Sequence, residues 1–329
     1  MSPWTPRWAE PPRGPRVLYA IISMGCALLL AAPLVSLMMH DEDFAARTRI
    51  VPIPMTTSRT PVPGPSPASP SFDGERREEL TRALDRYLDG RPGRLSVAVR
   101  DLATGLSYSY NPEHRPGTAS VVKVAIVAAL LLKAQRQDRA LTAAERALAE
   151  RAITVSDNDA ATALWHGIGG GPGLARAVKK LGLRRTEPGP GTAWGATTTS
   201  ASDQVRLMAA LTSSGGPLTG EHRRYLRGLM EDVVEEQAWG VSAAAGEGGD
   251  CALKNGWLPR EADGGAWTVN SVGHVRDGGH EYLIAVLSDR QSSMGAGVAA
   301  IEHVTETVTR ALAEASAAVQ TEGSGRHEG

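Results

Sequence analysis

Two groups of predicted strands, far apart in the sequence, constrain the fold of this chain most strongly. Leu95 to Arg100 and Leu106 to Tyr110 alternate apolar and polar residues around a Gly-containing turn, which predicts a hairpin. Three further strand-like segments come much later, at 252–254, 267–275 and 282–288. Because a strand needs a neighbour to satisfy its backbone, we expect the two groups to pair across everything between them.

The segment between the two groups of strands is predicted to be helical. Apolar residues at helical spacing predict helices over residues 121–132, 142–152, 159–166, 173–181, 202–212 and 221–234. Two more helices, over 75–88 and 295–315, flank the predicted strands. The expected architecture is α+β: one lobe with a sheet and helices built from both chain ends, and an all-α lobe inserted between them.

The N-terminal region predicts export and a membrane anchor. Residues 1–16 are polar and contain three arginines, whereas 17–39 are 23 residues without a charge. A helix of that length spans roughly 35 Å, enough to cross a bilayer. Arginines before it and acids after it place the N-terminus inside. A cleaved signal peptide is the alternative. The predicted parts are a cytoplasmic tail (1–16), an anchor (17–39), a Pro/Ser-rich linker (40–72), a globular domain (73–315) and a disordered tail (316–329).

The amino-acid composition argues against several kinds of partner and ligand for this chain. The formal net charge is -1, so electrostatics give no case for nucleic acid. The two cysteines are Cys26, within the predicted anchor, and Cys251, so we expect no disulfide in the globular part. The sequence has no H-E-x-x-H motif and no Cys/His cluster with metal spacing, so we expect neither a metal nor a cofactor.

One short motif at the start of the most apolar helix can carry chemistry. Ser120 stands where that helix begins, and Lys123 follows three residues later on the same face. A buried lysine can lose its proton and act as the base that makes a serine nucleophilic. The structural alternative is an N-capping serine beside an extended lysine. The chain has only five lysines against thirty arginines, which cannot act as bases, and this favours the chemical interpretation.

Two further motifs follow in order: Ser156-Asp-Asn158, in a break between two helices, and Lys254-Asn-Gly256, on a predicted strand. Ser-x-x-Lys, Ser-Asp-Asn and Lys-(Thr/Ser)-Gly form the three-part signature of penicillin-binding proteins and class A β-lactamases. The chain resembles this superfamily over roughly residues 78–315. The resemblance implies a β-lactamase/transpeptidase-like fold with an antiparallel sheet.

The resemblance also implies a role for each residue that matches a motif. Ser120 would be the acylated nucleophile, Lys123 its base partner, and Ser156 the relay of a proton to the leaving nitrogen. Lys254 would supply positive charge for a substrate carboxylate. Four residues would bind the substrate: Asn158, Asn255, Gly256 and Trp257. The backbone N–H groups of Ser120 and Trp257 would form the oxyanion hole.

The sequence departs from the family pattern in three places. Class A β-lactamases hold the hydrolytic water with a loop glutamate in a Glu-x-x-x-Asn pattern. In residues 184–196 the candidate for this deacylation role is Glu187, but Gly191 stands in place of the asparagine; the alternative is that Glu187 is a surface residue. Asn255 replaces the Thr or Ser of the third motif, and Trp257 is unusually bulky for the edge of a cleft.

Two hypotheses about function follow. The first is an exported, membrane-anchored serine hydrolase that forms an acyl-enzyme at Ser120 with β-lactams or D-Ala-D-Ala-like peptidoglycan peptides, either as a slow β-lactamase or as a penicillin-binding protein. The second is a non-hydrolytic module that keeps the fold to bind penicillin or a cell-wall ligand. We expect a monomer attached through residues 17–39 with its domain outside the cell, or secreted if a signal peptide is cleaved.

Overall fold

The structure, a computed structural model, describes residues 72, 74–246 and 248–324, which belong to one compact unit. The predicted cytoplasmic tail, the anchor and the linker up to residue 71 lie outside these residues. Among the described helices, none combines the length and the apolar character that a membrane crossing requires.

The strands from the two chain ends form one sheet, as the sequence predicts. Its strand order is β2-β1-β5-β4-β3, and every neighbouring pair is antiparallel. The strands are β1 (Arg94–Asp101), β2 (Ser107–Tyr110), β3 (Asp250–Pro259), β4 (Trp267–Asp277) and β5 (His280–Gln291). β1 pairs with β5 over its full length, so the first and last strands of the chain lie side by side at the centre of the domain.

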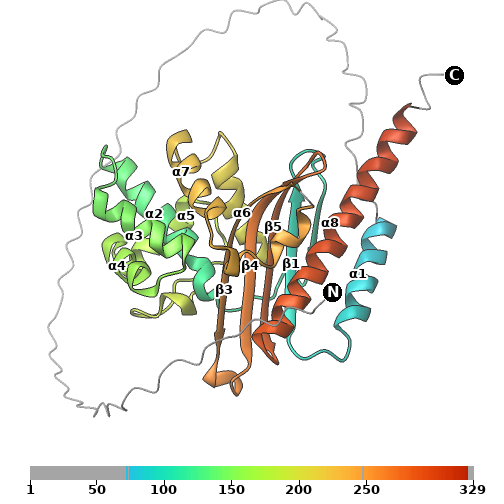
Figure 1. Cartoon of the computed structure of the whole chain (residues 1–329), viewed down its shortest axis with the longest axis horizontal. Coiled ribbons are helices and arrows are strands. Elements are labelled where there is room, and N and C mark those ends of the chain that lie inside the picture. Colours follow the sequence, from blue (N-terminus) through green and yellow to red (C-terminus); the bar gives the residue numbers. More distant parts are fainter. Residues whose placement is uncertain (1–71, 73, 247, 325–329) are drawn as a thin grey trace, which may run out of the picture. The chain divides into compact units, whose positions relative to one another are not determined.

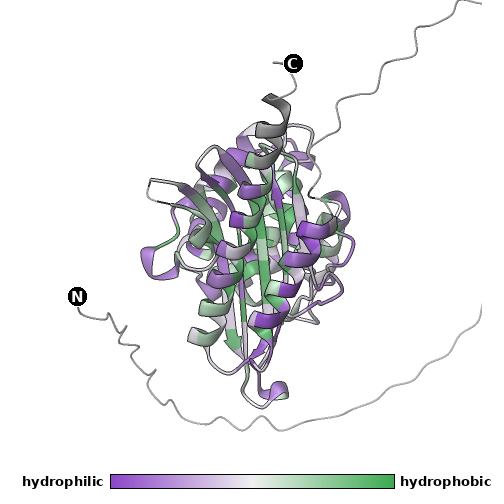
Figure 2. Ribbon diagram, turned by 90° about the vertical axis from the view of Figure 1, so that its right-hand side faces the viewer, coloured by the Kyte–Doolittle hydropathy of each residue, from purple (hydrophilic) through white to green (hydrophobic). Residues whose placement is uncertain are grey.

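Helices cover both faces of this sheet (Figure 1). Side chains alternate along β5: Ile284 and Val286 face the core formed with α1 (Gly74–Leu88) and α8 (Met294–Ser324). Leu283, Ala285 and Leu287 face the core shared with the helical lobe. This period of two is the pattern of a strand buried on both faces. Figure 2 shows the same arrangement, with apolar residues gathered on the strands between more polar helices.

The last helix is longer than the sequence predicted. We expected it to end at residue 315 and residues 316–329 to be disordered, but α8 continues to Ser324. That expectation is therefore wrong for residues 316–324. The added segment contains two alanines and no Pro, a composition that permits the helix to continue despite its polar residues.

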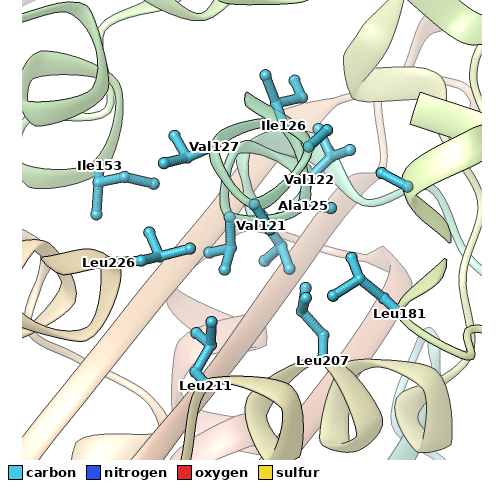
Figure 3. Close-up of a cluster of buried hydrophobic side chains, with 14 of the residues drawn as sticks. Val121, Val122, Ala125, Ile126, Val127, Ile153, Leu181, Leu207, Leu211 and Leu226 are labelled. Carbon is cyan, nitrogen blue, oxygen red and sulfur yellow. The ribbon is translucent and has the colours of Figure 1, made fainter. Parts of the chain in front are cut away.

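The inserted lobe is helical. It contains α2 (Val122–Arg136), α3 (Ala143–Thr154), α4 (Asn158–Ile168), α5 (Gly170–Lys180), α6 (Ala201–Thr212) and α7 (Gly220–Glu231). α2 is buried on nearly all sides in its first turns, and Figure 3 shows its residues surrounded by Ile153, Leu181, Leu207, Leu211 and Leu226 from neighbouring elements. A helix that is apolar all round belongs at the centre of a lobe, and the N-terminus of this one carries the Ser-x-x-Lys motif.

Candidate active site

Ser120 lies in a tight turn that joins the lobes. It sits in a short 3-10 helix, Ala119–Val121, directly before α2, and its side chain is half-buried. Ala119 has a φ of 48°, a left-handed conformation that is unfavourable for a residue with a Cβ. The surrounding structure must hold this turn in place, since local preference does not.

Strand β3 holds the turn from one side. A Cβ placed on Gly256 would lie 2.6 Å from the Ser120 nitrogen and 2.7 Å from the Val121 nitrogen. Only glycine allows the strand backbone to approach this closely. The third motif therefore contacts the backbone of the first, and the absence of a side chain at Gly256 is what permits that contact.

A second residue, Asn270 on β4, holds the same turn, and it was not predicted from the sequence. Its amide donates to the carbonyls of Gly117 and Thr118 at 2.8 and 3.1 Å, and its carbonyl oxygen accepts from the Ser288 N–H at 3.0 Å. Asn270 is fully buried with both ends of its side chain paired. A polar residue within a predicted apolar strand was the available signal.

Lys123 is fully buried within the motif cluster. Its Nζ donates to the Ser156 carbonyl at 2.6 Å, to the Ser156 Oγ at 3.1 Å and to the Asn158 Oδ1 at 2.9 Å. Burial lowers the pKa of Lys123 to about 8, and the charge of Asp157 opposes this shift. The first two motifs are thus in direct contact, although none of the hydrogen bonds in the described residues joins Lys123 to the Ser120 hydroxyl.

The Ser156-Asp-Asn158 motif is shaped to present its two polar side chains to Lys123. Ser156 has a φ of 57°, which turns its carbonyl towards the ammonium. Asp157 caps the N-terminus of α4 by accepting from the Ala160 N–H at 2.8 Å, and it forms an ion pair with Arg151. The middle residue of the motif therefore fixes the loop and stays out of the cluster around the ammonium.

Lys254 is the second fully buried lysine of the site. Its Nζ donates to the Asn255 carbonyl at 3.0 Å. Burial, together with the positive charge of Lys123, lowers the pKa of Lys254 to about 7. A buried ammonium whose charge has so few partners is well suited to receive an anion.

Asn255 lies differently from its predicted substrate-binding role, whereas Glu187 lies as the surface alternative expects. The Asn255 amide donates both its hydrogens to backbone carbonyls, of Gln237 at 2.7 Å and Trp239 at 2.8 Å, so it has none left for a substrate. The Glu187 side chain is 72% exposed and forms an ion pair with Arg115 at 2.7 Å. Asn255 therefore anchors a neighbouring loop, and Glu187 is a surface residue.

Trp257, at the edge of β3, is half-buried and packs edge-on against Trp239 with ring centroids 5.7 Å apart. This contact supports a packing role for Trp257 in preference to stacking on a ligand. Its position in the strand directly after Gly256 keeps its backbone close to the Ser120 turn.

A second tryptophan, Trp194, was not singled out from the sequence. Its ring centroid lies 5.0 Å from the Lys123 Nζ, within the range of a cation–π contact. Its position in a Gly- and Pro-rich loop carried no signal of such a contact. Among the described residues, no group of three or more His, Cys, Asp or Glu side chains is placed to hold a metal ion.

A family comparison agrees with this geometry. The family described as the Beta-lactamase enzyme family matches residues 78–144 and 142–312, which cover the sheet and the helical lobe. The chain belongs to this family. A relative at 28% identity over 225 residues, covering 66% of this chain and 69% of its own, is LppW of Mycobacterium tuberculosis and Mycobacterium bovis, which is named as a candidate lipoprotein.

Solved structures share the fold. A class A β-lactamase from Bacteroides cellulosilyticus is 19% identical with a TM-score of 0.62, covering 72% of this chain and 98% of that one. TLA-3 extended-spectrum β-lactamase is 16% identical with a TM-score of 0.65, covering 72% and 99%. A mutant of PBP-A, in an acyl-enzyme complex with penicillin G, is 20% identical with a TM-score of 0.63, covering 76% and 100%. The predicted α+β, β-lactamase/transpeptidase-like fold is confirmed.

Proposed function

We propose that this protein is a serine hydrolase that forms an acyl-enzyme at Ser120 with β-lactams or D-Ala-D-Ala-like peptides. The observation that carries the proposal is the fully buried Lys123, which bonds to Ser156 and Asn158 one turn from the serine. A lysine with a pKa of about 8 can act as a base near neutral pH. Family membership supports the same chemistry.

In the proposed acylation step, the Ser120 Oγ attacks the amide carbonyl carbon while Lys123 takes its proton. The backbone N–H groups of Ser120 and Trp257 would stabilise the resulting oxyanion. The C–N bond then breaks, and a proton passes from Lys123 through the Ser156 hydroxyl to the leaving nitrogen. The 3.1 Å hydrogen bond between Lys123 and the Ser156 Oγ supports this route.

The two buried lysines suggest how substrate binding prepares the base. Both have lowered pKa values, about 8 for Lys123 and about 7 for Lys254, because both are buried. A substrate carboxylate beside Lys254 would favour its charged form. That positive charge would in turn hold Lys123 in its neutral form, because like charges disfavour each other. A carboxylate-bearing substrate would therefore activate its own attack.

The site is less well equipped to release the acyl group than to form the acyl-enzyme. Deacylation needs a base that activates water, and Glu187, the candidate from the sequence, is exposed and paired with Arg115. We therefore propose a long-lived acyl-enzyme, as in a penicillin-binding protein, in preference to an efficient β-lactamase. The non-hydrolytic binding module is the alternative if no acyl-enzyme forms.

Location and assembly complete the proposal. The uncharged segment 17–39 would anchor the chain in the cell membrane with the domain outside, and the lipoprotein name of LppW is consistent with a protein of the envelope. We propose a monomer whose linker holds the domain away from the bilayer.

The test is incubation of the purified chain with penicillin G, followed by intact mass over time. We expect an adduct of one penicillin that forms in the wild type and is absent in Ser120→Ala. No adduct at any time would refute acylation and favour the binding module. An adduct that appears and then disappears during the incubation would instead indicate a β-lactamase.

A further inference from the structure

The loop that carries Trp194 places an indole ring beside Lys123. Trp194 begins a short 3-10 helix, Trp194–Ala196, and is half-buried. Its ring lies 5.0 Å from the Lys123 Nζ. The three hydrogen bonds of this ammonium go to Ser156 and Asn158, and the indole ring adds a cation–π contact to them.

The indole is held in place by a series of hydrogen-bonded residues that leads from Trp194 to Lys123. Its Nε1 donates to the Thr162 Oγ1 at 3.1 Å, and the Thr162 hydroxyl donates to the Asn158 carbonyl at 2.9 Å. Asn158 in turn accepts from Lys123 at 2.9 Å. Asn158 and Thr162 lie four residues apart, on one face of α4. Trp194, α4 and Lys123 therefore form one connected cluster.

The backbone of the loop that carries Trp194 contacts the segment just before Ser120. The Thr118 N–H donates to the Thr197 carbonyl at 2.8 Å, just before the Ser120 turn. A Cβ on Gly195 would lie 3.8 Å from the Ala119 Cα, in ordinary contact. The residue after Trp194 thus packs directly on the residue before Ser120, which leaves the indole little freedom to swing away.

We propose that Trp194 determines the lifetime of the acyl-enzyme by excluding water from the Lys123 side of Ser120. This inference rests on the proposed acylation. Hydrolysis requires a water oxygen to bond to the ester carbon, a base to take its proton, and the Ser120 Oγ to leave with a proton. Lys123, the proposed base of the acylation step, would serve as the base here too, and the indole ring lies over its Nζ. Trp194 acts through Lys123 and is a positioning residue.

The test compares four variants after acylation by penicillin G and removal of the excess. Trp194→Ala opens the site, and we expect the adduct to decay about tenfold faster or more, in line with the effect of a general base on water. Trp194→Phe keeps an aromatic face and should stay within about twofold of the wild type. Thr162→Val removes the hydrogen bond to the indole without emptying the loop, and should shorten the lifetime about threefold. Thr162→Ser keeps the hydroxyl and should not change it.

The pH dependence separates this role from a merely structural one. In Trp194→Ala, the decay rate should rise with pH as Lys123, whose pKa is about 8, loses its proton and becomes able to activate water. A Trp194→Ala adduct as long-lived as that of the wild type, or a decay that does not change with pH, would overturn the inference. Absence of any adduct in the wild type would overturn the proposed acylation instead.

Discussion

Two walls enclose the candidate site, and they differ in what they contribute. The strand wall consists of residues 254–257 of β3 and Asn270 of β4, and it approaches Ser120 backbone to backbone. The loop wall consists of residues 184–199, and it covers Lys123 with the Trp194 ring. On the strand wall, a glycine and a fully paired asparagine fix the Ser120 turn. On the loop wall, the acidic side chain that matched best in sequence points to solvent.

This difference indicates that the two proposed half-reactions, acylation and release, would depend on different parts of the molecule. Formation of the proposed acyl-enzyme would need the strand wall and Lys123, and these are closely packed and hydrogen-bonded. Release needs a water and a base, which the loop wall does not offer. A site can therefore keep the first half-reaction while it loses the second, and substitutions on the two walls should have separable effects.

The largest expected effect comes from the lysine that lies between the walls. Lys123→Met keeps the length and burial of the side chain but removes the base, so we expect acylation by penicillin G to slow by about 10³-fold. Lys133→Met is the matched control, since Lys133 lies on the same helix and donates to the Gly167 carbonyl away from the site. Adduct formation followed by intact mass gives the rate; equal rates for Lys123→Met and the wild type would contradict its role as base.

Next in size is a change to the strand wall. Gly256→Ala places a Cβ 2.6 Å from the Ser120 nitrogen, so the turn or the strand must move. Because the proposed oxyanion hole uses these same backbone groups, we expect acylation to slow by about 10²-fold. Gly228→Ala in α7 is the control, because nothing lies within 4 Å of its Cβ position. Normal acylation in a folded Gly256→Ala variant would show that the close contact is unimportant.

The sequence predicted the strand wall better than the loop wall, and the reason is physical. Motif residues such as Gly256 can be identified by residue type and spacing, and strand pairing then determines where they lie. Asn270 is conspicuous as a polar residue in an apolar strand, but its contacts, like those of Trp194, come from tertiary packing between distant segments, which no local pattern specifies. For Asn255, the sequence indicated a donor, but only the structure shows that the Gln237 and Trp239 carbonyls take both its hydrogens.

A smaller effect is expected from pH, and it tests whether both lysines act on the substrate. Burial lowers the pKa of Lys254 to about 7 and that of Lys123 to about 8. Below these values both lysines hold protons and no base is available, so acylation should fall about tenfold per pH unit. Above them, Lys254 loses the charge that binds a carboxylate.

The control for the pH profile is a penicillin methyl ester, which carries no carboxylate. As pH rises, the rate of acylation by penicillin G should pass through a maximum between the pKa values of Lys254 and Lys123. The rate of acylation by the ester should rise and then level off. The measurement is the second-order rate of adduct formation from roughly pH 5.5 to 9.5, a range that brackets both groups. A flat profile for penicillin G would rule out titration of the lysine pair in this step.

The smallest effect is expected on the loop wall, at the residue that the sequence proposed for deacylation. Glu187→Gln removes a carboxylate that is 72% exposed and paired with Arg115, and surface ion pairs of this kind contribute little to stability. We expect the lifetime of the penicillin G adduct to change by less than about twofold. An adduct that persists at least tenfold longer in Glu187→Gln would mean that the carboxylate turns inward in the acyl-enzyme, and the loop wall would then take part in release after all.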